Sequence, residues 1–147
     1  MKDNVKNPDF EVDVRASFAR QAIMETLGAD LSEVQPGRVV IDLPFQAAFT
    51  QQHGFLHAGI VTAGLDSACG YAAMTLMPKG AAVLTVELKT SLMSPARGAR
   101  FRCAAEVVKA GRTLSFAEAR CTAPDGTLVA RLSATLMTIE GRADVSG

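Results

Sequence analysis

The chain has 147 residues with 15 basic and 15 acidic side chains, so its formal net charge is zero. This balance excludes a sequence-wide attraction to nucleic acid or to an anionic membrane, and neither is expected as a partner. The length predicts one domain over 1–147 with its own hydrophobic core. The three cysteines, Cys69, Cys103 and Cys121, are widely spaced in apolar surroundings, which favours free thiols and a reducing, cytoplasmic location.

Residues 1–14 are charged and lack the apolar stretch of a secretory signal, so we expect a loosely ordered lead-in. The pattern then predicts a helix over 17–27, capped by the serine at its start and stopped by Gly28. A Pro-Gly turn follows, and alternating apolar residues over 38–45 predict a strand.

A nearly unbroken apolar stretch over 58–77 is the most informative part of the chain, because one carboxylate, Asp66, lies near its centre. The length matches a membrane span. The central Asp66, the many small residues and the absence of a flanking basic cluster argue instead for a helix wrapped by a sheet. A carboxylate in such a helix is costly to bury unless it is paired or used. We therefore expect chemistry at Asp66; the alternative is a buried carboxylate that caps another subunit's backbone.

The rest of the chain has the period of strands, over 81–93, 99–110, 113–123 and 127–139. Short connections rich in Gly, Pro and Asp join them, as between antiparallel strands. Helices and strands are thus segregated, which predicts an α+β protein with an antiparallel sheet curled around one long helix.

The polar loop and the helix together resemble a family motif. Hotdog-fold thioesterases of the branch that includes the PaaI proteins and acyl-CoA thioesterases carry Asn or Gln, five residues, His-Gly-Gly, and then Asp or Glu nine positions after the His. Here the corresponding residues are Gln51, His57-Ala58-Gly59 and Asp66. Thr85 falls where that family often has a Ser or Thr facing the active site. The resemblance covers roughly 35–139, and Ala58 departs from it by replacing the first Gly.

The resemblance implies a hotdog fold and an acyl-CoA thioesterase that needs no cofactor. Asp66 would activate water or attack the thioester, and Gln51 and Thr85 would position the water or the carboxylate. The N–H groups of Ala58 and Gly59, at the positive end of the helix, would hold the oxyanion. His57 would fix the loop or contact the thioester.

The spacing along the helix bears on the assembly. Ala58 and Asp66 are eight residues apart, or about 12 Å along a helix, too far for one carbonyl to touch both. If both act on one thioester, the site lies between subunits. The resemblance agrees, since hotdog proteins dimerise by joining sheets, and a homodimer or a dimer of dimers is expected.

Two other functions stay open at this point. One is a hotdog dehydratase or hydratase acting on acyl carrier protein thioesters, which would pair His57 with Asp66. The other is an acyl-CoA-binding module without activity, with Ala58 as the trace of its loss. A metal site is not expected, because Gly54 places His53 and His57 in a loop before the helix, where a His-x-x-x-His pair does not converge.

The sequence does not reveal the acyl group. The scarcity of aromatic residues, with no Trp, one Tyr and seven Phe, weakly favours an aliphatic chain. Basic residues near predicted strand ends could hold the phosphates of coenzyme A. These residues are Arg97, Arg100, Arg102, Lys109 and Arg112.

Overall fold

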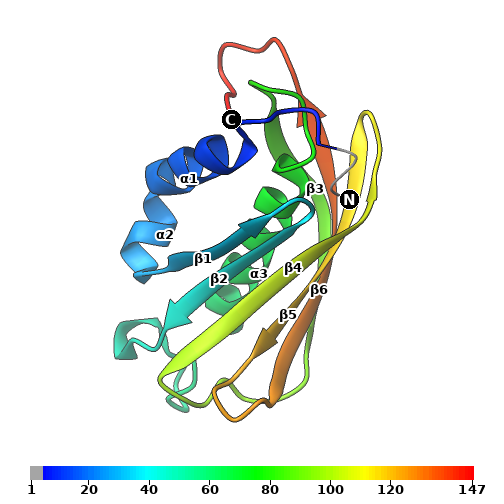
Figure 1. Ribbon diagram of the computed structural model, residues 1–147. Coiled ribbons are helices and arrows are strands. Elements are labelled where there is room, and N and C mark those ends of the chain that lie inside the picture. The colour runs from blue at the N-terminus through cyan, green and yellow to red at the C-terminus, as the bar shows by residue number, and fades with distance from the viewer. Residues whose placement is uncertain (1–4) are drawn as a thin grey trace.

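The computed structural model describes residues 5–147, in which an antiparallel sheet curves around one long helix (Figure 1). The six strands follow the order β1-β2-β4-β5-β6-β3 across the sheet. This confirms the predicted α+β hotdog fold. The helices are α1 (Phe10–Arg20), α2 (Ala22–Leu27) and α3 (Ala58–Met74), with a short 3-10 helix at Ala47–Phe49. The strands are β1 (Asp30–Gln35), β2 (Arg38–Pro44), β3 (Ala82–Leu92), β4 (Arg100–Ala110), β5 (Leu114–Thr122) and β6 (Leu128–Ile139).

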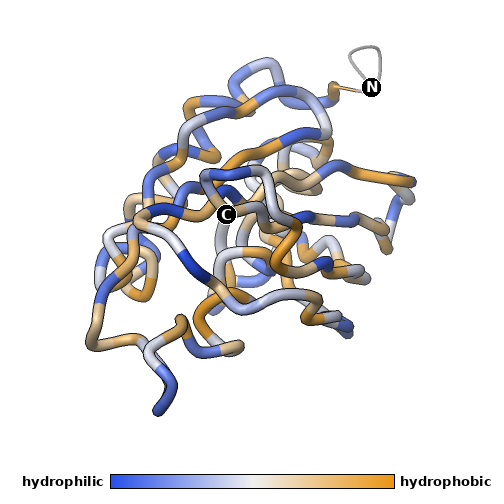
Figure 2. The backbone as a smooth tube through the Cα atoms, turned by 90° about the horizontal axis from the view of Figure 1, so that it is seen from below, coloured by the Kyte–Doolittle hydropathy of each residue, from blue (hydrophilic) through white to orange (hydrophobic). Residues whose placement is uncertain are grey.

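The core lies between α3 and the concave face of the sheet. Exposed and buried residues alternate along β5 and much of β4, as expected for strands with one covered face. Figure 2 shows short hydrophilic and hydrophobic stretches that follow one another along the chain. At Gly64 the helix comes so close to the sheet that an added Cβ would lie 2.6 Å from Leu43 Cδ1 and 3.0 Å from Cys103 Sγ. The small residues of α3 therefore allow the close approach that the sequence predicted.

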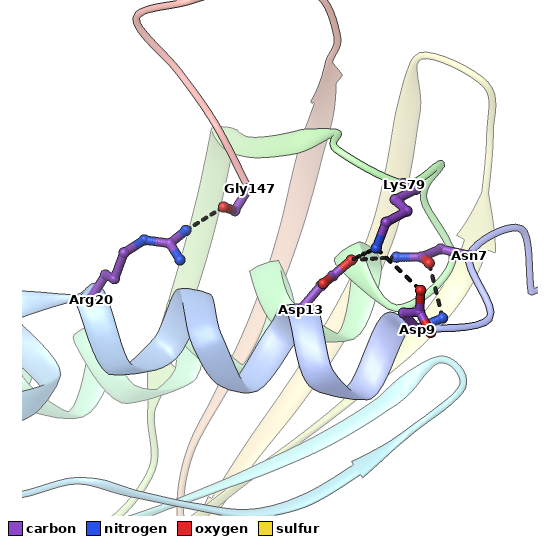
Figure 3. A network of polar contacts seen from close by, with 6 residues as sticks. All are labelled: Asn7, Asp9, Asp13, Arg20, Lys79 and Gly147. Atoms are coloured by element: carbon purple, nitrogen blue, oxygen red, sulfur yellow. Dashed lines mark hydrogen bonds and ion pairs between the residues drawn. The ribbon is translucent and has the colours of Figure 1, made fainter.

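The first helix begins earlier than predicted, at Phe10 rather than Ser17, so 10–14 are helical and not part of a loose lead-in. The reason is a turn at Asn7, whose Oδ1 accepts the Asp9 N–H at 2.9 Å. Asn7 Nδ2 also donates to Asp13 at 2.8 Å, and Lys79 Nζ, which follows α3, lies 3.1 Å from the same carboxylate (Figure 3). These contacts fasten α1 to the end of α3. Residues 1–4 of the expected lead-in lie outside the described part of the chain.

The predicted helix over 17–27 is divided at Gln21, whose extended backbone (φ −81°, ψ 101°) separates α1 from α2. Gly28 ends α2 in the left-handed conformation at φ 68°, as the sequence indicated. Strand β1 was not predicted. It is an edge strand in which only Val34 is buried, so it carries little of the apolar alternation that identifies a strand.

One side of α3 is not covered by this chain. Thr62, Asp66 and Gly70 recur along that side and are half-buried, so the sheet does not wrap every side of the helix. The neighbouring strand β3 is the other edge of the sheet and pairs only with β6. Four of its large apolar side chains are 41–57% exposed: Leu84, Val86, Leu88 and Leu92. Within residues 5–147, no helix is long and apolar enough to span a membrane.

Candidate active site

The predicted site residues fall into two groups that lie at two cavities along α3. The first cavity, about 530 Å³, is lined by Gln51, His57 and Ala58 among others. The second, about 360 Å³, is lined by Asp66 and Thr85 among others. The two cavities have no lining residue in common. One chain therefore does not bring the candidate catalytic residues together.

Gln51 organises the loop that precedes α3. Its side-chain Oε1 accepts the N–H of His53 at 2.7 Å and the N–H of Phe55 at 3.4 Å. Its backbone N–H also donates to the Phe55 carbonyl at 2.8 Å. Gln51 thus has a structural role that the sequence did not indicate. These bonds leave the side-chain NH₂ group of Gln51 without a partner among the described residues.

His57 is the N-cap of α3. Its Nδ1 accepts the Gly59 N–H at 2.8 Å, which fixes the loop against the helix in the way the resemblance implied. The Gly59 N–H is therefore not a free oxyanion donor, which corrects the sequence-based expectation. Among the hydrogen bonds of the described residues, none uses the Ala58 N–H. A neutral imidazole that accepts at Nδ1 carries its proton on Nε2, so His57 also offers a donor.

Asp66 and Thr85 are in direct contact. Thr85 Oγ1 donates to Asp66 Oδ1 at 2.7 Å, so the strand residue orients the helix carboxylate. A β-bulge permits this contact, because Val86 has no partner on β6 while Thr85 and Glu87 pair with consecutive residues. Beyond the bulge, Thr90 also reaches α3 and accepts from Thr62 at 3.1 Å.

A polar cluster that the sequence pattern does not predict lies beside Asp66. Ser67 Oγ donates to Gln21 Oε1 at 2.8 Å, and Gln21 Nε2 donates to the Tyr71 hydroxyl at 3.1 Å. The Ser17 hydroxyl lies 3.3 Å from the same tyrosine oxygen. All four residues line the second cavity with Asp66. Ser67 and Tyr71 are close to Asp66 along the helix, but nothing in the sequence links Gln21 or Ser17 to it.

The remaining candidate residues, a histidine and three arginines, differ in what surrounds them. His53 lines neither cavity, and within residues 5–147 no three metal-binding side chains come together. Arg97 lies over the ring of Phe55, which lines the first cavity, with its guanidinium carbon 4.5 Å from the ring centroid. Arg100 pairs with Asp30 at 2.9 Å, and Arg102 lies 3.8 Å from Glu33, so carboxylates already face both.

The three cysteines are buried and free, as predicted. Burial raises the pKa of the Cys69 thiol to about 12, and the nearby Asp66 carboxylate adds to the shift. A hydrogen bond with Cys121, together with burial, raises the pKa of Cys103. Protonated, buried thiols are poor nucleophiles, so Asp66 is the stronger candidate for attack on an acyl carbon.

Comparisons with known proteins agree with this geometry. A model of the thioesterase superfamily matches residues 53–130, which include the end of the loop, α3 and strands β3, β4 and β5. Human acyl-coenzyme A thioesterase 13 is 32% identical over 87 residues, which cover 58% of this chain and 61% of the human protein.

Solved structures show the same fold. A thioesterase family protein from Silicibacter pomeroyi is 55% identical and superposes with a TM-score of 0.87, covering 90% of this chain and 99% of the other. The E. coli PaaI protein from the phenylacetic acid degradation operon superposes with a TM-score of 0.84 over 90% of this chain and 95% of its own, at 19% identity. The chain therefore belongs to the thioesterase superfamily and is a thioester hydrolase with the hotdog fold.

Proposed function

We propose that the protein hydrolyses acyl-CoA thioesters to a free acid and coenzyme A. The observation that carries this proposal is the Asp66 carboxylate, oriented by Thr85 on the open face of α3, where it is accessible to a substrate. The similarity to human acyl-coenzyme A thioesterase 13 supports coenzyme A as the thiol. Arg97, beside the first cavity, adds a positive charge suited to its phosphates.

The proposed site forms between two copies of the chain. Ala58 and Asp66 are about 12 Å apart along α3, and their two cavities share no residue. A second copy on the open face of α3 would bring its Asp66 next to the Ala58 end of the first. The exposed apolar side chains and unpaired edge of β3 support such an interface. We propose a homodimer, alone or within a dimer of dimers.

The carbonyl of the thioester would be polarised at the start of α3. The Ala58 N–H and the His57 Nε2–H would donate to its oxygen, and the positive end of the helix dipole would stabilise the oxyanion. Ala58 keeps the N–H that the family's Gly would supply. The added methyl group of Ala58 leaves less room for the thioester to approach, but the N–H donor remains.

Asp66 of the partner subunit would supply the attacking oxygen. As a general base it takes a proton from water while the water oxygen bonds to the carbonyl carbon; the C–S bond then breaks, and the leaving thiolate takes that proton from Asp66. As a nucleophile it would bond to the carbonyl carbon while the C–S bond breaks and the thiolate leaves, and water would then cleave the resulting mixed anhydride to the free acid and the Asp66 carboxylate. In either route Thr85 fixes one carboxylate oxygen, and the NH₂ group of Gln51 would orient the water or the other oxygen.

The hydrogen bonding of the His57 imidazole favours hydrolysis over dehydration or hydration. A dehydratase of this fold would use the imidazole as a base. Here Nδ1 already accepts the Gly59 N–H, so the neutral ring presents a donor and not a free lone pair. A donor suits an oxyanion that develops on the substrate.

Thiol release from acyl-CoA esters tests the activity, and subunit mixing tests the shared site. Asp66→Asn removes the carboxylate. Ala58→Pro removes one N–H at the first position of α3, where proline is tolerated, and the His57 backbone (φ −59°, ψ 142°) suits a residue before proline. Each variant alone should lose activity, and each mixed dimer should regain one working site. Confirmed mixed dimers without recovered activity, or an active monomer in sedimentation, would contradict the proposal.

A further inference from the structure

Gly70 is a glycine inside α3 that no packing contact within the chain explains. It lies one helical turn after Asp66, on the same face, and lines the same cavity. A Cβ at Gly70 would meet only Val83 Cγ1, at 3.9 Å, which is ordinary contact. Glycine within a helix lowers stability relative to alanine. Gly70 therefore leaves open space beside Asp66 at the expense of helix stability. Space next to the reacting carboxylate is space that the acyl group could occupy.

The wall of this space is polar on one side. Gln21, Ser67 and Tyr71 bond to one another, but their bonds do not use all their hydrogen-bonding groups. The second N–H of Gln21 and the lone pairs of Ser67 are left over. Val83, Leu84 and Met74 supply an apolar side to the same cavity. Such a lining fits a short carbon chain that carries a group able to donate and accept a hydrogen bond.

The charges decide which end of a thioester enters each cavity. Arg97 stacks on a ring of the first cavity, which suits the anionic coenzyme A. No lysine or arginine is among the residues that line the second cavity, where Asp66 adds negative charge. With the carbonyl held between the two, the second cavity is left for the acyl group.

We infer that the cavity beside Asp66 is the acyl pocket, and that Gln21, Ser67 and Tyr71 select acyl groups bearing a hydroxyl, with Gly70 leaving the room. This inference rests on the proposed thioesterase function and deepens it by naming the substrate class. The specificity residues would come from the break between α1 and α2 and from the helix turn after Asp66.

The experiment compares kcat/KM for hexanoyl-CoA, 3-hydroxyhexanoyl-CoA and 6-hydroxyhexanoyl-CoA. The wild type should prefer at least one hydroxylated ester by about 10-fold, the effect of one or two uncharged hydrogen bonds. Tyr71→Phe and Gln21→Leu should reduce that preference to about 2-fold or less by lowering kcat/KM for the hydroxylated ester alone. Gly70→Val should lower kcat/KM for all three esters relative to acetyl-CoA, because it fills the pocket.

Gln46→Leu is the matched control. Gln46 is also a half-buried glutamine, which donates to the Leu27 carbonyl at 3.0 Å, but it lines neither cavity. Its loss should leave the preference unchanged. Equal rates for hydroxylated and plain esters in the wild type, or equal losses on all esters in Tyr71→Phe, would overturn the inference while leaving the thioesterase function standing. Absence of thiol release from every ester would remove the function and the inference together.

Discussion

The covered and open faces of α3 differ in whether packing within the chain accounts for their residues. On the covered face, Gly64 is required because a side chain there would collide with Leu43 and Cys103, and Leu65 and Ala68 are fully buried. On the open face, Asp66 and Gly70 fill no such requirement within one chain. The covered face is explained by packing alone. Asp66 and Gly70 reduce the stability of the helix, and no packing contact within the chain accounts for them. We therefore assign both residues to substrate chemistry.

Asp66→Asn gives the strongest test of whether the open face serves catalysis and not packing. The substitution is nearly isosteric, so we expect kcat to fall by at least about 100-fold, the scale of a positioned acid or base. The melting temperature should change little, because Asp66 is half-buried and the amide can still accept from Thr85. A variant that keeps more than a third of wild-type kcat would show that Asp66 is structural.

Gly64→Ala tests the covered face. The added methyl would have to displace Leu43 and Cys103, both buried, so we expect a loss of about 1–3 kcal/mol in the free energy of unfolding. Urea denaturation measures the loss directly. The kcat of the folded variant should stay near wild type. Unchanged stability would mean that the helix is less tightly seated on the sheet than the distances indicate.

The pH dependence of stability also reports on the covered face. The folded state raises the pKa of Cys69 from 9.0 to about 12, so the stability that this shift contributes is complete below pH 9 and is lost as the pH rises toward 12. The slope from this one group reaches about 1.4 kcal/mol per pH unit. Denaturation series between pH 8 and 11 should therefore be flatter for Cys69→Ala than for wild type. Parallel curves would show that the thiol is more solvated than its position indicates.

Gly70→Ala should give the smallest change and the opposite sign from Gly64→Ala. Because the space at the Cβ position is open, the added methyl group meets no clash, and only the higher helix propensity of alanine affects stability. We therefore expect a gain of about 0.5–1 kcal/mol in the free energy of unfolding. Thermal denaturation at fixed protein concentration is the measurement. Destabilisation, or dissociation of an oligomer, would show that a second subunit packs against Gly70.

The sequence predicted the long helix and four later strands because each has a clear period or a clear apolar run. It failed where structure depends on distant partners. Strand β1 has one buried residue, and α1 starts at a turn in which Asn7 donates to Asp13, whose carboxylate also pairs with Lys79 in the turn after α3. The motif positions of Asp66 and Thr85 were predicted, and their contact agrees with the role proposed for them. Gln21 was missed because its approach to Ser67 joins segments 46 residues apart.

The bulge at Val86 has a consequence for comparing relatives by alignment. Thr85 and Thr90 are separated by an odd number of positions, so on a regular strand they would face opposite sides of the sheet. The extra residue lets both reach α3, one at Asp66 and the other at Thr62. A relative that is one residue shorter between these two positions would have an even separation, so both side chains could face α3 on a regular strand without the bulge. A single gap at this edge strand in an alignment would therefore indicate that a relative lacks the bulge, and not that it has lost the oriented carboxylate.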